Sequence, residues 1–175
     1  MLKNSEHPLE YIFHPRSIAV IGVSPDPDSP GLLFLLPYVK AGFEGGLYPI
    51  GRNSGEVLNL KIYKSLLEIP GPVDFVMVAI PASATPQLMR ECAEKKVKTV
   101  AFFTAGFTEA GTDEGLKLEK ELVEIARKGN FRIIGPNCLG MYVPASRVSF
   151  TADAPLESGR FGFFSQSGGH TANTI

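Results

Sequence analysis

The sequence predicts an α/β protein built on a Rossmann-like, doubly wound parallel sheet. Short apolar, β-branched runs alternate along the chain with longer segments of helical periodicity. The apolar runs are followed by loops rich in glycine, proline, serine and asparagine. The chain has 175 residues, 44% of them hydrophobic and 20% charged, which suits one well-buried domain of ordinary composition.

The first part of the chain begins with a buried strand. Ser17 to Gly22 reads Ser-Ile-Ala-Val-Ile-Gly, an apolar run that ends in glycine. The elements expected after it are a loop at 24–30, a helix at 31–41 that is apolar on most sides, a second strand at 47–50, and one helical turn at 63–67.

The second part repeats the pattern of a strand followed by a helix. The clearest strand in the chain is 73–80, VDFVMVAI. The elements expected after it are a helix capped by Ser83 and ending near Lys95, a strand at 98–104, a helix at 113–128 capped by Thr112 and ended by Gly129 and Asn130, and a fifth strand at 131–134.

Strands that alternate with helices form right-handed crossovers, and the sheet is therefore expected to be parallel. Ligands of such sheets bind beyond the carboxyl ends of the strands. The loops that should form a site are those after Ile21, Ile50, Ile80, Phe103 and Ile134.

The C-terminal part has a different character. Residues 144–158 lack helical periodicity and are expected to be an extended connector. Residues 159–165 read as a new buried strand, followed by a turn and the start of a helix. We therefore divide the chain into a domain at 1–145 and a connector with the truncated start of a second domain at 146–175, and expect the chain to be a fragment.

The composition of the chain argues against several classes of binding partner. The net charge is −1, so no basic excess indicates nucleic acid or an anionic membrane. Cys92 and Cys138 match no metal-ligand spacing, and no metal site is expected. With no apolar leader and no long apolar run, a cytoplasmic location is the simplest expectation.

The turn from Gly22 to Gly31 lets backbone N–H groups approach phosphate oxygens, but GxGxxG, the dinucleotide fingerprint, cannot be written in it. Six further segments form an ordered set of motifs, at residues 12–24, 42–50, 73–82, 104–109, 135–140 and 165–168. Together and in this order they resemble the ADP-forming acetyl-CoA synthetases, and the α subunits of succinyl-CoA synthetase are similar in organisation.

The resemblance implies that the first domain binds coenzyme A and that a flavodoxin-like second domain begins near residue 159. The family converts acyl-CoA, phosphate and a nucleoside diphosphate into acid, CoA and triphosphate, through an acyl-phosphate and a phosphohistidine. Its phosphorylated histidine would lie downstream of this chain, so no catalytic residue is expected here. The implied partners are CoA or acyl-CoA, a second α domain, and an ATP-grasp domain or β subunit.

The resemblance also implies site residues. The positions expected to contact CoA are Gly22, Ser24, Ser29, Gly31, Arg52, Ile80, Pro81, Ala82, Thr104, Ala105, Gly106, Asn137 and Cys138. Ser167, Gly168 and Gly169 match a helix start that faces a phosphate. The chain departs from the family pattern at Asp28, where glycine is usual, and at Pro37, which is expected to interrupt the first long helix.

Other functions stay open at this point. The same pair of domains precedes an acetyltransferase domain in some regulatory enzymes, and a Rossmann domain can also be an NAD(H) sensor. The absence of an acidic residue at the end of the second strand, where Gly51 and Arg52 stand, argues against NAD. Cys138 is not expected to be a nucleophile, because no histidine lies in a plausible partner loop. The acyl substrate and the nucleoside diphosphate are not predicted.

Overall fold

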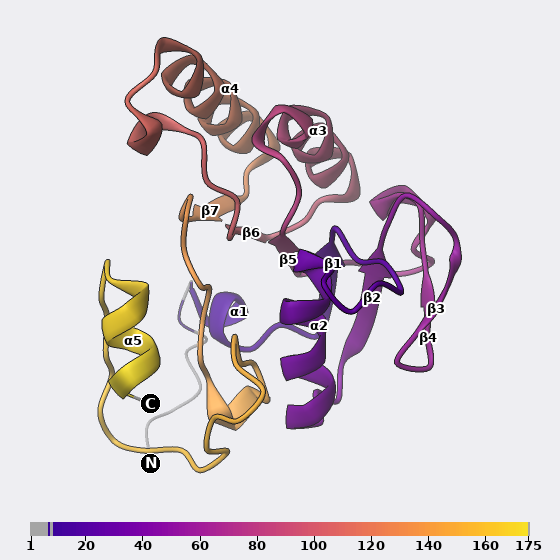
Figure 1. Ribbon diagram of the computed structural model, residues 1–175, viewed down its shortest axis with the longest axis vertical. Helices are drawn as coiled ribbons and strands as arrows, with labels where there is room; N and C mark the ends of the chain where they lie inside the picture. The colour runs from indigo at the N-terminus through magenta and orange to yellow at the C-terminus, as the bar shows by residue number, and fades with distance from the viewer. Residues whose placement is uncertain (1–6, 8, 175) are drawn as a thin grey trace.

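The computed structural model describes residues 7 and 9–174. A five-stranded parallel sheet with the order β2-β1-β5-β6-β7 forms its centre (Figure 1). Its strands are β1 (Ser17–Ile21), β2 (Gly46–Ile50), β5 (Phe75–Val78), β6 (Thr99–Phe102) and β7 (Arg132–Ile134). This arrangement confirms the predicted α/β fold with a doubly wound parallel sheet.

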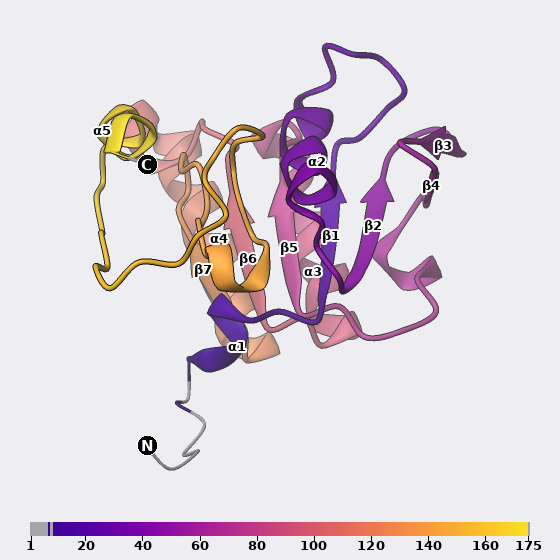
Figure 2. The same cartoon turned by 90° about the horizontal axis from the view of Figure 1, so that it is seen from below.

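Helices cover both faces of the sheet (Figure 2). α3 (Thr85–Lys95) and α4 (Asp113–Gly129) lie on one face, and α2 (Pro30–Ala41) lies on the other. β1 and β5 are buried along their whole length because both of their faces are covered, and apart from Ser17 their residues are apolar. The order of the strands reverses between β1 and β5, so the switch point of the sheet lies at their carboxyl ends.

α4 follows the sequence prediction closely. The hydroxyl of Thr112 accepts a hydrogen bond from the N–H of Gly115, which caps the first turn as predicted. Asn130 has the left-handed conformation that ends a helix. The buried side of α4 includes Leu122 and Ala126, which belong to the core cluster shared with α3 and the sheet.

Two helix predictions were wrong in detail. Ser83 does not cap α3: it lies inside a 3-10 turn (Ala82–Ala84), and α3 begins at Thr85, whose hydroxyl donates to the carbonyl of Ala82 at 2.7 Å. Pro37 does not interrupt α2, which continues through it to Ala41. A proline inside a helix removes a single N–H donor, and here the buried packing of α2 outweighs that loss.

A hairpin that the sequence analysis did not predict follows β2. β3 (Gly55–Val57) pairs antiparallel with β4 (Leu60–Ile62), and Leu58 and Asn59 at its tip both have positive φ. A bridge between Ile50 and Tyr63 joins the chain after the hairpin to the edge of the main sheet. The predicted helical turn at 63–67 forms slightly later, at Leu66–Glu68.

The C-terminal part departs most from expectation. The connector includes a 3-10 turn (Pro144–Ser146) and the buried residue Val148, which packs into the core on the α2 side. Residues 159–165, predicted as a buried strand, form no strand, and Phe161 and Phe164 are 101% and 95% exposed. A strand needs a neighbouring strand for its backbone hydrogen bonds, and the described chain offers none there. α5 (Gly168–Thr174) follows as the predicted helix start.

Candidate functional site

Five loops follow the parallel strands at one edge of the sheet, as predicted (Figure 2). Backbone hydrogen bonds join each loop to its neighbour across this edge. They run from Gly22 and Val23 to the carbonyl of Ile50, from Ala79 to Ile21, from Phe103 to Val78, and from Asn137 to Thr104, at 2.9–3.1 Å. The predicted CoA-contacting residues therefore lie along one continuous edge.

Two glycines set the turn between β1 and α2. Gly22 has φ of 94°, and a Cβ there would collide with the carbonyl group of Ala79 in the loop after β5. A Cβ at Gly31 would lie 2.5 Å from the amide nitrogen of Val23. The N–H of Gly31 donates to the carbonyl of Gly22 at 3.2 Å. Both glycines therefore permit close backbone packing at the switch point.

The two serines of this turn bond to the turn itself. The Ser29 side chain is buried, and its hydroxyl donates to the carbonyl of Gly22 at 2.9 Å and accepts from the N–H of Ser24 at 3.1 Å. The hydroxyl of Ser24 accepts from the N–H of Asp26 at 3.3 Å. Ser29 thus shapes the loop, while Pro25 to Asp28 form its exposed crest.

Arg52 lies just beyond the carboxyl end of β2 and is exposed. No acidic side chain forms an ion pair with it within residues 7 and 9–174. Gly51 before it packs against the carbonyl of Val23, so the β2 end and the β1–α2 turn are in direct contact. A guanidinium at this place can form forked hydrogen bonds to a phosphate group.

The loops after β5 and β6 are held together. The buried hydroxyl of Thr104 donates to the carbonyl of Ile80 at 2.7 Å. Ala82 and Gly106 line one surface hollow together with Ser83, Pro86 and residues of the start of α4. Pro81 is exposed beside them. The structure therefore brings Ile80, Pro81, Ala82, Thr104, Ala105 and Gly106 to one place.

Asn137 and Cys138 lie in the loop after β7. Asn137 is exposed, with φ of 51°, and Cys138 donates its N–H to the carbonyl of Phe102 at 2.9 Å. Desolvation raises the pKa of the Cys138 thiol, and this outweighs the backbone hydrogen bonds that lower it. A thiol with a raised pKa is a poor nucleophile, which agrees with the sequence argument against a catalytic cysteine.

Ser167 precedes α5, and Gly168 and Gly169 are its first two residues. A Cβ at Gly168 would lie 3.2 Å from the side chain of Leu139, so the start of α5 is next to the loop after β7. The hydroxyl of Ser167 accepts from the N–H of His170 at 3.3 Å. A phosphate-facing role for these three residues stays a prediction.

Glu109, the last residue of the 104–109 motif, was given no role in the sequence analysis. Glu109 accepts hydrogen bonds from the backbone N–H groups of Gly106 and Phe107 at 2.8 and 3.3 Å. Desolvation acts to raise its pKa, but the backbone N–H groups outweigh it, and the pKa lies below its ordinary value. The available signal was an acidic residue three positions after the glycine of a strand-end loop.

Within residues 7 and 9–174, no group of three or more His, Cys, Asp and Glu side chains is placed to hold a metal ion. The helices of that same part of the chain include none with the length and apolar character needed to cross a membrane.

A family model described as a CoA binding domain matches residues 16–144. Among curated proteins, the chain is 41% identical over 165 residues to the alpha subunit of acetate–CoA ligase [ADP-forming] I from Pyrococcus furiosus, covering 91% of this chain and 36% of that protein. It is 37% identical to 4-hydroxybutyrate–CoA ligase [ADP-forming] from Nitrosopumilus maritimus, covering 90% and 23%.

Solved structures from the same group of proteins have a similar fold. The crystal structure of PH0766 from Pyrococcus horikoshii OT3 superposes with a TM-score of 0.86 at 39% identity, covering 95% of this chain and 38% of that one. An acetyl-coenzyme A synthetase 1 from Ca. Korarchaeum cryptofilum, in complex with phosphate and ADP, gives 0.77 at 34% identity, covering 86% and 32%. The chain thus spans between 23% and 38% of the length of these relatives.

Proposed function

Because the chain belongs to the CoA binding domain family, we propose that it holds coenzyme A, or the CoA part of an acyl-CoA, across the carboxyl edge of its sheet. The observation that carries the proposal is the unbroken series of backbone hydrogen bonds that joins all five strand-end loops. The chain is homologous to the alpha subunits of ADP-forming acyl-CoA synthetases. The family resemblance supports CoA as the ligand, and the geometry of the loops supports the carboxyl edge of the sheet as its place.

The order of the loops suggests how CoA lies. The exposed guanidinium of Arg52 favours the adenosine 3′-phosphate at the β2 end of the edge. The glycine-flanked turn before α2 suits the diphosphate, because its backbone can approach closely. The amide arm then extends over the loops after β5, β6 and β7, where Asn137 offers a side-chain amide.

For the whole protein we infer the reversible conversion of acyl-CoA, phosphate and a nucleoside diphosphate into acid, CoA and triphosphate. This chain would supply the part that holds CoA, in partnership with a second α domain and an ATP-grasp domain or β subunit. Neither of its two cysteines has the environment of an activated thiol, because burial raises the pKa of Cys92 as well as that of Cys138. The 175-residue chain alone should therefore show no turnover.

Calorimetric titration with CoA, dephospho-CoA and NADH tests the proposal. We expect CoA to bind more tightly than dephospho-CoA by about 1.5–3 kcal/mol, the usual size of a hydrogen bond to a charged group. Arg52→Ala should remove this difference. Arg132→Ala is the matched control, because Arg132 is an exposed arginine at the opposite end of β7.

Absence of binding heat with CoA, or tighter binding of NADH than of CoA, would contradict the proposal. Equal loss of the CoA preference in the Arg132→Ala control would show that a general charge effect, not Arg52, recognises the 3′-phosphate.

A further inference from the structure

Three consecutive backbone N–H groups in the loop after β6 are bound by carboxylates of the same chain. Glu109 accepts from Gly106 at 2.8 Å and from Phe107 at 3.3 Å, and Glu119 of α4 accepts from Thr108 at 3.0 Å. Gly106 has φ of 104°, a backbone conformation that only glycine adopts readily. The loop is thus held in an unusual shape by charge-assisted hydrogen bonds.

The other end of this loop is fixed independently. The hydroxyl of Thr104 bonds to the carbonyl of Ile80, and the carbonyl of Thr104 accepts the N–H of Asn137 at 3.1 Å. Ala105 lies between the two anchors and is exposed. Within the described chain, its N–H and carbonyl take part in no hydrogen bond. A free, rigidly held peptide group at the ligand edge is suited to the amides of a pantetheine arm.

We propose that Glu109 is a positioning residue of the CoA site, which holds the loop after β6 so that the peptide groups of Ala105 face the amide arm of CoA. The inference rests on the proposed function and adds a residue to which neither the sequence analysis nor the comparisons assign a role. Glu109 itself touches the loop and not the ligand. Its carboxylate holds the loop in one conformation before CoA binds, so that less conformational entropy is lost on binding.

The sign of the effect separates this role from simple electrostatics. CoA is an anion, so removing a nearby negative charge should strengthen its binding if charge alone matters. If Glu109 positions the loop, removing it should weaken binding instead. Glu124 provides the charge control, because it is an exposed glutamate of α4 that makes no side-chain hydrogen bond within the described residues.

The test compares Glu109→Ala, Glu109→Gln and Glu124→Gln in the 175-residue chain, titrated with CoA and with adenosine 3′,5′-bisphosphate, which lacks the arm. Glu109→Ala should weaken CoA binding about tenfold, which corresponds to the loss of one hydrogen bond to a charged group, and leave bisphosphate binding unchanged. Glu109→Gln keeps an acceptor oxygen and should restore part of the affinity. Glu124→Gln should not weaken CoA binding.

Amide hydrogen exchange at Gly106 and Phe107 should be faster in Glu109→Ala than in the wild-type chain.

Unchanged or tighter CoA binding by Glu109→Ala, with a wild-type chain that binds CoA, would overturn the inference and leave the proposed function standing. Equal losses for CoA and the bisphosphate would also overturn it, because the effect would then not concern the arm. A wild-type chain that does not bind CoA would overturn both proposals.

Discussion

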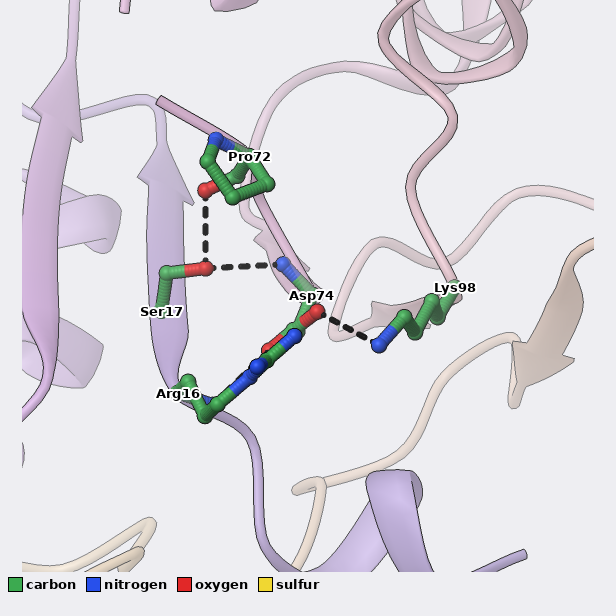
Figure 3. A network of polar contacts seen from close by, with 5 residues as sticks. All are labelled: Arg16, Ser17, Pro72, Asp74 and Lys98. Carbon is green, nitrogen blue, oxygen red and sulfur yellow. Dashed lines mark hydrogen bonds and ion pairs between the residues drawn. The ribbon is translucent and has the colours of Figure 1, made fainter. Parts of the chain in front are cut away.

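Asp74 is a buried carboxylate, 3% exposed, at the edge of the sheet opposite the candidate site (Figure 3). It accepts from the backbone N–H of Arg16 at 2.9 Å and pairs with Lys98 at 3.0 Å. The hydroxyl of Ser17 accepts from the N–H of Asp74 and donates to the carbonyl of Pro72. One residue thus joins the starts of β1, β5 and β6.

Asp74→Asn should lower the free energy of unfolding by about 1.5–3 kcal/mol at neutral pH, because the amide lacks the negative charge that strengthens the hydrogen bond with Lys98. Chemical denaturation measures this value. Asp153→Asn is the control: Asp153 pairs with Lys40 at 3.6 Å, but its side chain is 91% exposed, so the change should cost little. A cost for Asp74→Asn no larger than that of the control would contradict this account.

The difference in the free energy of unfolding between wild type and Asp74→Asn should depend on pH. Desolvation acts to raise the pKa of Asp74, but the hydrogen bonds from Arg16 and Lys98 and their charges outweigh it, so its pKa in the folded state is lowered. Its stabilising contribution is therefore complete above the unfolded-state pKa of about 3.9 and is lost as the pH falls through the lower folded-state pKa. The stability gap between wild type and Asp74→Asn should shrink in that acid range. A stability difference that stays constant down to strongly acid pH would contradict the lowered pKa of Asp74.

At the scale of elements, the turn between β1 and α2 shows how sequence becomes a site. Gly22 and Gly31 allow the backbones of this turn and of the loop after β5 to pack in direct contact. The hydroxyl of Ser29 closes the turn from inside. The exposed crest at 25–28 then projects beyond the edge of the sheet. Its position depends on the absence of a side chain at residue 31.

Gly31→Ala should displace this turn and weaken CoA binding by at least tenfold, because the new Cβ has only backbone atoms to collide with. Gly71→Ala is the control, since a Cβ there meets no atom within 4 Å. The measurement is calorimetric titration of both variants with CoA, with unfolding followed in parallel. Wild-type affinity in Gly31→Ala would show that the turn tolerates displacement and does not shape the site.

Elements with strong periodicity could be predicted from the sequence. The central strands are apolar runs, with Ser17 as the one polar residue of β1 and β5, and α4 carries its own capping residue, Thr112. The hairpin of β3 and β4 could not be predicted from the sequence. Its tip is formed by Leu58 and Asn59 in place of the asparagine-glycine pair that marks such turns. The start of α3 was missed because Ser83 belongs to a 3-10 turn.

The candidate site could be predicted at the level of loops, but not always at the level of atoms. Parallel topology alone places all five strand ends at one edge. Whether a hydroxyl faces outward or bonds to its own turn depends on tertiary packing, and Ser29 and Thr104 both turned out to bond inward. The role of Glu109 in the loop became visible only through its distances to two backbone N–H groups.

At the scale of the whole molecule, the two edges of the sheet differ in kind. The amino edge is closed by the polar network of Asp74, while the carboxyl edge presents the five loops and the exposed Arg52. The tail lies on the α2 side of the sheet, and its exposed segment 159–165 leads into α5 (Figure 1). Phe161 and Phe164 in this segment are large apolar side chains that are almost fully exposed, and exposed apolar patches of this kind are typical of interaction surfaces.

Mapping backbone amide chemical shifts during a titration with CoA tests the central claim most directly. We expect the changes to concentrate in the loops after the five parallel strands, including the turn at 22–31, Arg52, and residues 80–82, 104–106 and 137–138. Amides around Asp74 at the opposite edge should stay unchanged. Shifts centred on the Asp74 edge or the outer face of α4, or no shifts at saturating CoA, would contradict the account.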